Sequence, residues 1–336
     1  FSRNDATHSS SPCTPYNGFA QRRNDAKNKS SQCSCKLLTE DCQLLAPCSL
    51  LLAPCPMPYA LCSMPYATYL YPMDLKSILD QAMVVTLEAA DFIRSQAGKV
   101  TADDVITKSR NSLVSYVDQT AEEILVKGLA NIIPGAGFIT EEETVTQQKS
   151  EYTWILDPLD GTTNFLQQIP VYSVSVGLVH DGRIVLGIVS DVERRETFYA
   201  WKGGGAWCNG ERISVSGRTD VQDAVVATGF PYASRDVLPQ LTAVFEYFLK
   251  NARGIRRLGS AAIDLAYVAC GRFDVYYETT LNPWDIAGGI IIVEEAGGIV
   301  TDFSGQGDMM DNGQVIAGPL QIHAAAAAHI RTIFGA

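Results

Sequence analysis

An apolar run that ends in two carboxylates and a turn is the feature that most constrains how this 336-residue chain can fold. Residues 154–165 read WILDPLDGTTNF. The Ile-Leu pair predicts a short buried strand, Pro158 is expected to stop it, and Gly161 lets the backbone fold back. Asp157 and Asp160 would then face one point together with the amides and hydroxyls of the turn. Oxygen groups of this kind suit a divalent cation such as Mg²⁺ and a phosphate.

Two further segments end in acids. Residues 137–143, GFITEEE, predict another apolar strand, and residues 282–285, NPWD, place Asp285 at the start of a helical run. Each element would offer its carboxylate to a common cleft. Any one of these acids alone is more simply explained as an exposed side chain or a helix cap. Only their combination indicates a metal site.

Together the three segments resemble the inositol monophosphatase family of Mg²⁺-dependent, lithium-sensitive phosphatases. DPLDGTTNF at residues 157–165 matches the family's first signature, and WDIAGG at 284–289 with EEAGG at 294–298 matches the second. The resemblance covers nearly everything from Met73 to Ala336. It implies an α/β (α+β) fold, the layered αβαβα sandwich of this family, and a homodimer.

The resemblance implies two or three Mg²⁺ ions in each active site. The implied ligands all present oxygen to the ions: Glu141, Asp157, the Leu159 carbonyl, Asp160 and Asp285. The first three would hold one ion, while Asp157, Asp160 and Asp285 would hold a second. A third, weaker ion would lie near Glu141.

The identity of the glutamate ligand is less certain than that of the aspartates. The family has Gly before its acidic pair, whereas this chain has Thr140 there and a third acid at Glu143. Glu141 and Glu142 therefore stay open as the ligand, and the register favours Glu141.

The implied reaction is direct, in-line attack on the phosphate by a water held on a metal ion, without a covalent phosphoenzyme. Metal ions lower the pKa of such a water and neutralise the phosphate. The resemblance implies catalytic roles for Glu141, Thr162 and Asp118, with Thr162 and the acid behind it, Asp118, taking the proton.

Substrate contacts are implied on both sides of the metals. The backbone amides of Gly161 and Thr162 would hold the phosphate. The groups implied to contact the sugar or cyclitol are Asp160, Gly259, Ser260, Ala261, Glu278 and Asp285. Taken alone, Glu278 could equally be an exposed carboxylate at a strand end. Arg256 and Arg257 would suit a phosphate clamp in isolation, but the resemblance implies that their strand lies near the subunit contact.

The resemblance implies a small phosphorylated polyol or sugar as the substrate. TTNF at residues 162–165 looks like the inositol branch, whereas nucleotidases commonly carry Lys-Glu-Phe and histidinol phosphatases Arg-Ala-Phe. We therefore expect hydrolysis of inositol 1-phosphate. The alternatives are 3′(2′),5′-bisphosphate nucleotidase, fructose-1,6-bisphosphatase and histidinol phosphatase activities. A protein-binding role in a transcription complex is an alternative of another class, and the complete set of acids argues against a purely non-enzymatic protein.

The first 72 residues differ from the rest in composition. They hold seven of the nine cysteines and a proline-rich repeat with cysteines at 48, 55 and 62. The prolines exclude a continuous helix, so we predict disorder rather than a coiled coil. A seven-nucleotide DNA repeat read continuously would produce such a pattern. Our hypothesis is that residues 1–72 translate upstream repeat DNA, and that residues 73–336 form the inositol monophosphatase-like catalytic domain.

Charge and hydropathy narrow the possible partners. The chain has a net charge of −11, and without its first 72 residues, which hold six Lys and Arg against four Asp and Glu, the net charge is −13. This balance argues against nucleic acid as a partner. No run approaches ~20 apolar residues and no secretory signal pattern is present, so neither a membrane span nor export is predicted. Cys208 and Cys270, the remaining cysteines, suit a reducing cytoplasm.

Hydrophobic periodicity predicts the remaining elements. Helices are expected at residues 75–97, 120–132, 239–251, 260–270, 285–296 and 319–333. Strands are expected near residues 172–180, 183–191, 224–228, 274–278 and 298–302. Asp181-Gly182 predicts a hairpin, and residues 203–205 a tight turn between strands. Elements mixed in this order favour helices layered on sheets.

Overall fold

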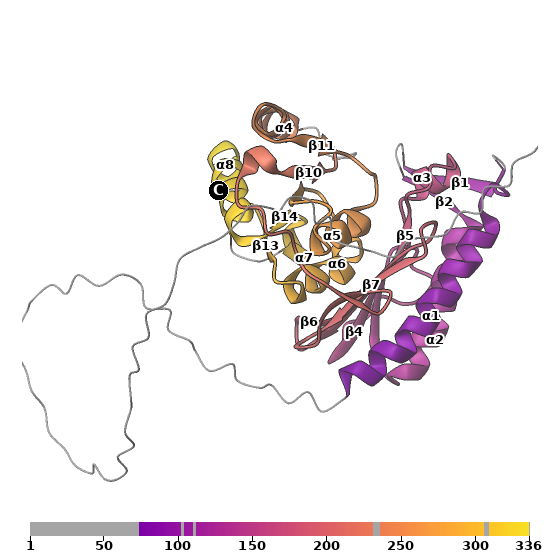
Figure 1. Cartoon of the computed structure of the whole chain (residues 1–336). Helices are drawn as coiled ribbons and strands as arrows, with labels where there is room; N and C mark the ends of the chain where they lie inside the picture. The colour runs from indigo at the N-terminus through magenta and orange to yellow at the C-terminus, as the bar shows by residue number, and fades with distance from the viewer. Residues whose placement is uncertain (1–73, 102–103, 110–111, 231–235, 306–308, 336) are drawn as a thin grey trace, which may run out of the picture. The chain divides into compact units, whose positions relative to one another are not determined.

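The computed structural model describes residues 74–101, 104–109, 112–230, 236–305 and 309–335 (Figure 1). The predictions of disorder in residues 1–72 and of a start at Met73 lie outside these residues. Among the described helices, none is both long enough and apolar enough to cross a membrane.

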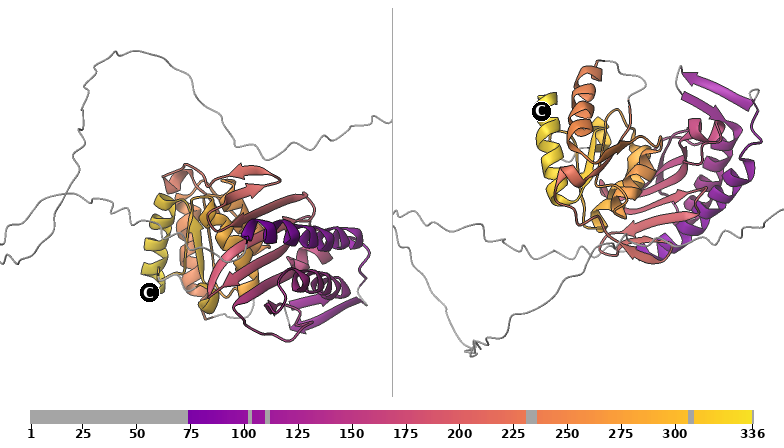
Figure 2. Two further views of the ribbon diagram at one scale, coloured as in Figure 1. Left: turned by 90° about the horizontal axis from the view of Figure 1, so that it is seen from below. Right: turned by 45° about the horizontal axis from the view of Figure 1, so that its top comes forward.

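Helices and sheets alternate in layers within the described residues (Figures 1 and 2). The outer helix pair packs on a large sheet, a second pair lies between this sheet and a smaller one, and a third pair covers the far face of the smaller sheet. In that order the pairs are α1 (Leu75–Gln96) with α2 (Tyr116–Ile132), α5 (Ala261–Ala269) with α6 (Pro283–Glu295), and α4 (Leu238–Asn251) with α8 (Leu320–Phe334). The predicted αβαβα sandwich is confirmed.

The large sheet has its strands in sequence order. Its members are β3 (Gly137–Thr140), β4 (Tyr152–Asp160), β5 (Ser173–His180), β6 (Arg183–Asp191), β7 (Glu196–Trp201), β8 (Gly205–Cys208) and β9 (Glu211–Ile213). The first pair is parallel, and the later pairs are antiparallel. The predicted hairpin at Asp181-Gly182 joins β5 to β6, and the predicted turn at residues 203–205 joins β7 to β8.

The smaller sheet mixes parallel and antiparallel pairs in the order β11-β10-β12-β14-β13. Its strands are β10 (Val225–Thr228), β11 (Gly254–Arg256), β12 (Val275–Glu278), β13 (Ile299–Thr301) and β14 (Val315–Gly318). Shorter elements complete the described chain: β1 (Val105–Ser109) paired with β2 (Ser112–Ser115), α3 (Thr162–Leu166), the 3₁₀ turn Val221–Asp223 and α7 (Met309–Asn312).

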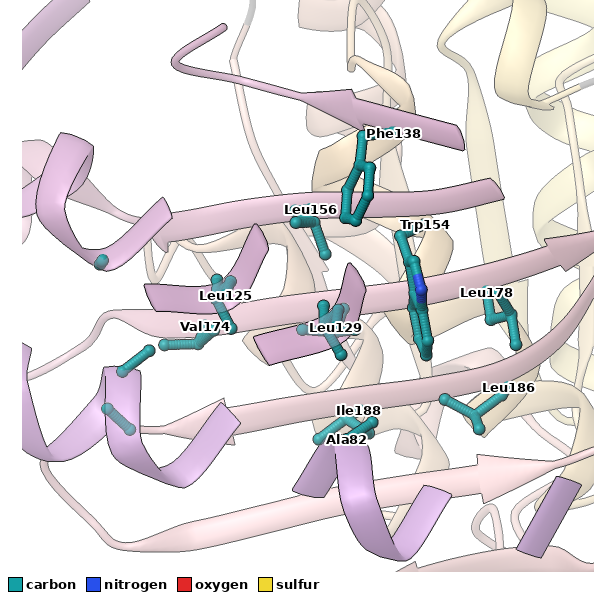
Figure 3. Close-up of a cluster of buried hydrophobic side chains, with 14 of the residues drawn as sticks. Ala82, Leu125, Leu129, Phe138, Trp154, Leu156, Val174, Leu178, Leu186 and Ile188 are labelled. Carbon is teal, nitrogen blue, oxygen red and sulfur yellow. The ribbon is translucent and has the colours of Figure 1, made fainter. Parts of the chain in front are cut away.

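One hydrophobic core lies between the outer helix pair and the large sheet (Figure 3). Leu129 of α2 lies beside Trp154 of β4, and Ala82 of α1 lies beside Ile188 of β6; all four side chains are fully buried. Fully burying one Leu or Ile contributes about 1.5–3 kcal/mol. The core therefore fixes α2 against β4, the strand that carries Asp157 and Asp160.

Two element boundaries close to the site differ clearly from the sequence prediction. Pro158 does not stop the strand: β4 continues to Asp160, and its pairing with β5 shifts register between Asp157 and Asp160. An irregularity of this kind accommodates a proline, which has no N–H for the ladder. In addition, α2 begins at Tyr116 rather than at residue 120, because Ser115 caps its N-terminus.

Small residues let α6 lie close to the large sheet. A Cβ built on Gly187 of β6 would lie 2.2 Å from the Gly288 carbonyl oxygen of α6, and one on Gly177 of β5 would lie 2.7 Å from the Cβ of Ala287. Only glycine leaves space for this approach. The packing brings Asp285, in the first turn of α6, toward the end of β4.

Candidate active site

Four acidic side chains from three segments form an electrostatic cluster. Asp157 is buried near the end of β4. Burial, followed by the charges of Glu141, Asp160 and Asp285, raises the pKa of Asp157 well above its ordinary value. Glu141 also shares a hydrogen bond with the Asp157 carboxyl group. The structure therefore brings together the strand end, the acidic loop after β3 and the first turn of α6, as the sequence predicts.

Protein donors hold two of these acids. Burial raises the pKa of Asp160 to about 6, although hydrogen bonds oppose the shift. Its Oδ2 accepts from the Ser260 hydroxyl at 2.6 Å and from the Ala262 N–H at 2.8 Å. Burial and then the Asp160 charge raise the pKa of Asp285, whose Oδ2 accepts from the Asn282 N–H at 2.7 Å. Each carboxylate has a defined orientation before any ligand binds.

The donor chemistry of this cluster fits a divalent cation. Its carboxylates are the hard oxygen ligands that Mg²⁺ prefers, and a cation would relieve the mutual repulsion that raises their pKa values. In the present conformation, no three His, Cys, Asp or Glu side chains of the described residues lie close enough together to hold one ion. Ser260 donates to one oxygen of Asp160, and the Asn282 N–H donates to one oxygen of Asp285.

Thr162 and Asp118 form the predicted pair beside the acidic cluster. The Thr162 hydroxyl lies 3.0 Å from Asp118 Oδ1 and 3.0 Å from the Leu159 carbonyl oxygen. Asp118 is buried, and burial raises its pKa despite hydrogen bonds from the Ser115 N–H and hydroxyl. A raised pKa makes this carboxylate a better proton acceptor, and the Thr162 hydroxyl contacts it from the turn after β4.

The smaller sheet contributes Glu278 to the opposite side of the cluster. Burial raises the pKa of Glu278 to about 7, while the Tyr276 hydroxyl, which donates to its Oε2 at 2.7 Å, opposes the shift. A Cβ on Gly229 would lie 1.9 Å from Glu278 Oε1, so the carboxylate lies against bare backbone. The charges of Asp160 and Arg257 also act on Glu278. Glu278 is thus part of the cluster and is not an exposed strand end.

The predicted Gly259-Ser260-Ala261 loop packs directly on the turn after β4. Gly161 and Gly259 both have positive φ, +98° and +92°, which glycine adopts without strain. The Asn164 side chain donates to the Val171 carbonyl at 2.8 Å and to the Leu258 carbonyl at 2.9 Å. Asn164 therefore joins the two loops that would hold a substrate.

Residues outside the sequence prediction also reach the cluster. The Asp264 carboxyl on α5 is buried, one of its oxygens has no hydrogen-bond partner, and burial followed by the Glu278 and Asp160 charges raises its pKa. Arg257 opposes the raised pKa of Asp160, Glu278 and Asp264. The Arg257 charge thus favours the ionised form of these acids, a role that the sequence alone did not predict for Arg256 or Arg257. Asn164 lies within the first signature, but an asparagine at this position does not by itself indicate that its side chain joins two loops.

A cavity of about 310 Å³ adjoins the acidic segments. Its wall includes Thr140 and Glu143, which flank the loop of Glu141, and Trp284, which precedes Asp285. The cavity therefore lies beside the segments that carry Glu141 and Asp285, although the four acids of the cluster do not line it.

Comparison with known proteins gives a consistent result. A model of the inositol monophosphatase family matches residues 74–334. Over 247 residues the chain is 40% identical to the inositol-1-monophosphatase of Mesorhizobium japonicum, which covers 73% of this chain and 93% of that protein. It is also 40% identical over 245 residues to a putative Nus factor SuhB of Neisseria meningitidis serogroup B, covering 72% of this chain and 94% of that protein.

Solved structures share the fold. The crystal structure of the extragenic suppressor protein SuhB from Bartonella henselae is 36% identical and has a TM-score of 0.73, covering 76% of this chain and 98% of that chain. The IMPase of Thermotoga maritima is 33% identical with a TM-score of 0.71, covering 77% and 98%.

Proposed function

Because this chain belongs to the inositol monophosphatase family, we propose that it is a Mg²⁺-dependent phosphatase that hydrolyses inositol 1-phosphate to myo-inositol and phosphate. The observation that carries this proposal is the convergence of buried acids from β4, the β3 loop and α6, beside the Thr162–Asp118 pair. Repulsive carboxylates gathered next to a hydroxyl–carboxylate pair suit a cation site with a proton acceptor.

The proposed metal ligands are the five groups inferred from the sequence: Glu141, Asp157, the Leu159 carbonyl, Asp160 and Asp285. Glu141 is preferred over Glu142, because Glu141 shares a hydrogen bond with the Asp157 carboxyl group and its charge raises the pKa of Asp157. Two or three bound Mg²⁺ ions would supply an activated water and neutralise the phosphate and the leaving oxygen.

The proton path uses two side chains of this protein. Thr162 Oγ1 accepts a proton from the attacking water while its own proton passes to Asp118 Oδ1, 3.0 Å away. Ser115 keeps Asp118 in position through two hydrogen bonds of 2.8 Å. Glu141 assists on the other side of the water. No nucleophilic side chain and no covalent intermediate are needed.

Substrate orientation comes from the loops on both sides of the acids. The Gly161 and Thr162 amides hold the phosphate, whereas Glu278 and the loop of Gly259, Ser260 and Ala261 contact the ring. Asp160 and Asp285 also accept hydrogen bonds from ring hydroxyls. Because a buried acceptor left without its hydroxyl is costly, Glu278 favours a polyol over an apolar leaving group.

Phosphate release by the full chain tests this function. The rates on inositol 1-phosphate, adenosine 3′,5′-bisphosphate, fructose 1,6-bisphosphate and histidinol phosphate would be compared with Mg²⁺ present, with Asp160→Asn as the control. The proposal requires inositol 1-phosphate to have the highest kcat/KM. Preference for another ester would move the assignment to a sister activity, and no release from any ester would contradict it.

A transcription-complex role is the second candidate. It is supported by the 40% identity to a protein named putative Nus factor SuhB, of which this chain covers 94%. Co-purification with RNA polymerase that survives Asp160→Asn would support a binding role separate from hydrolysis. If RNA polymerase co-purifies with neither the unaltered nor the variant protein, the transcription-complex role is excluded.

The assembled state and location are part of the same proposal. Family membership supports a homodimer, which the mass in solution tests by light scattering. Cys208 is buried and Cys270 is partly buried, and we propose the cytoplasmic location predicted from the sequence.

A further inference from the structure

Glu122 of α2 is a buried carboxylate with an unusual set of partners. It is fully inaccessible to solvent. Its Oε1 accepts from the Thr140 hydroxyl at 2.9 Å and from the Thr144 N–H and hydroxyl at 2.8 and 2.7 Å. Its Oε2 accepts from the Glu142 N–H at 2.7 Å. A buried carboxylate is tolerated only when donors surround it, and here every donor belongs to residues 140–144.

These donors lie on both sides of Glu141. Thr140 is the last residue of β3 and precedes Glu141, while Glu142 follows it directly. The Gln147 side chain adds to the clamp, since its Oε1 accepts from the Thr140 N–H at 2.8 Å and its Nε2 donates to the Thr140 hydroxyl at 3.0 Å. The backbone that presents Glu141 toward Asp157 is therefore held by Glu122 of the helix α2 as well as by Gln147 of its own loop.

The same helix also fixes Thr162. Asp118 and Glu122 are four residues apart and share one face of α2, and both are buried. Asp118 accepts from the Thr162 hydroxyl at 3.0 Å. The helix α2, packed on β4, thus sets the position of the loop that carries Glu141 and the position of the Thr162 hydroxyl.

We propose that Glu122 is a positioning residue that holds Glu141 in the orientation needed to bind the divalent cation. This inference rests on the metal-dependent function proposed above. Glutamine cannot replace Glu122, because its amide nitrogen would turn donor N–H groups toward the donors of residues 140–144. A side chain behind a metal ligand commonly changes metal affinity 10- to 100-fold, so loss of Glu122 should weaken cation binding more than it lowers the rate at saturation.

The test compares Glu122→Gln with Glu123→Gln in the full, metal-free chain. Glu123 is the exposed neighbour on α2 and serves as the matched control. Binding of Mn²⁺ would be measured by electron paramagnetic resonance, and hydrogen exchange would be followed for residues 140–144. We expect the Mn²⁺ Kd of Glu122→Gln to rise about 10-fold or more, with faster exchange of the amides of Glu142 and Thr144. Glu123→Gln should match the unaltered protein in both measurements.

Comparing the Mg²⁺ dependence of the rate with kcat distinguishes a positioning role of Glu122 from a general contribution to the stability of the fold. In Glu122→Gln the Mg²⁺ concentration for half-maximal rate should rise about 10-fold, with kcat largely recovered at saturating Mg²⁺. Lower stability with unchanged Mn²⁺ and Mg²⁺ dependence would overturn the proposal.

A second variant covers the case in which Glu122→Gln does not fold. Thr144→Val removes one donor to Glu122 from an exposed residue and keeps the N–H. It should weaken Mn²⁺ binding in the same direction by about 2- to 5-fold, within the reach of one hydrogen bond. Unchanged binding would overturn the proposal.

If the unaltered protein binds Mn²⁺ but releases no phosphate from any ester, the proposed function fails while these comparisons still decide the role of Glu122. Absence of Mn²⁺ binding would overturn both.

Discussion

At the scale of single residues, the buried and mutually repelling carboxylates of the acidic cluster lower the stability of the folded protein. Burial already disfavours ionised carboxylates, and each additional acid around Asp157 raises its pKa further. A core built only for stability would replace such acids with apolar side chains. The arrangement is therefore understandable as a site whose charge is neutralised by a ligand.

Replacing one proposed metal ligand should separate activity from stability. Asp160→Asn and Asp285→Asn keep the side-chain size but remove a ligand charge, so turnover should fall by about two orders of magnitude or more. Unfolding of the metal-free variants in urea should require the same free energy as the unaltered protein, or more, because a repulsive charge is gone. Asp181→Asn, at the exposed hairpin turn, is the control. Comparable turnover in either ligand variant would contradict the metal assignment.

The raised pKa of Glu278 predicts how stability depends on pH. Folding raises this pKa from 4.5 to about 7, so the folded state favours the protonated acid. The stability that this provides is fully present below about pH 4.5 and is lost as pH rises through 7. Each pKa unit corresponds to about 1.4 kcal/mol, so the loss is at most about 3.5 kcal/mol.

Glu278→Gln mimics the protonated acid and should remove this pH dependence. In the metal-free protein, the free energy of unfolding of the variant relative to the unaltered chain should rise by about 1–3 kcal/mol between pH 5 and pH 8. Urea titrations at the two pH values measure it, and Glu88→Gln, on the exposed side of α1, is the control. An equal difference between variant and parent at both pH values would rule out the shift.

At the scale of elements, hydrophobic periodicity predicted the helices and strands whose positions depend only on which face is buried. The helices near residues 75–97, 239–251 and 319–333, and the hairpin of β5 and β6, agree with the structure within about two residues, because apolar spacing directly reflects which face is covered. The start of α2 was predicted four residues late. Its first turn depends on the Ser115–Asp118 cap, a polar signal that hydrophobic periodicity does not contain.

Polar contacts between distant elements explain what sequence reasoning missed in the site. The signatures indicated the acids of β4 and α6 because each motif is contiguous. Glu122 carries no such signature, since its partners are 18 to 22 residues away in the chain. An acid at i+4 from Asp118, between apolar Ala121 and Leu125, was the available signal. Its target could not be known before β3 and α2 were placed side by side.

The approach of α6 to the large sheet predicts the cost of a single methyl group. In Gly187→Ala the new Cβ would lie 2.2 Å from the Gly288 carbonyl oxygen, so α6 must shift away. Overpacking of this kind costs about 1–3 kcal/mol, measured as the free energy of unfolding in urea. Because Asp285 lies in the first turn of α6, kcat/KM should also fall. Gly217→Ala is the control, since nothing lies within 4 Å of its Cβ. A Gly187→Ala protein as stable as its parent would show that the helix is not held this closely.

At the scale of the whole molecule, the acidic site joins layers that have separate hydrophobic cores. β4 and the β3 loop belong to the large sheet, α6 lies between the sheets, and Glu278 belongs to β12 of the smaller sheet. Their apolar residues form distinct clusters, one under the outer helix pair and others around the smaller sheet. A cation bound by acids of several layers would therefore act as a link between them.

This link predicts that Mg²⁺ stabilises the folded chain. A ligand that binds only the folded state stabilises it by about 2.7 kcal/mol at one hundred times its Kd. For a domain of this size each kcal/mol raises the Tm by about 2–4 °C, so saturating Mg²⁺ should raise it by about 5–10 °C over the same protein in EDTA. Asp157→Asn removes the acid proposed to bridge both ions and should abolish the rise, while Asp181→Asn should keep it. If Mg²⁺ raised the Tm of Asp157→Asn as much as that of the unaltered protein, the stabilising ion would bind elsewhere and the acids would not be the link between layers.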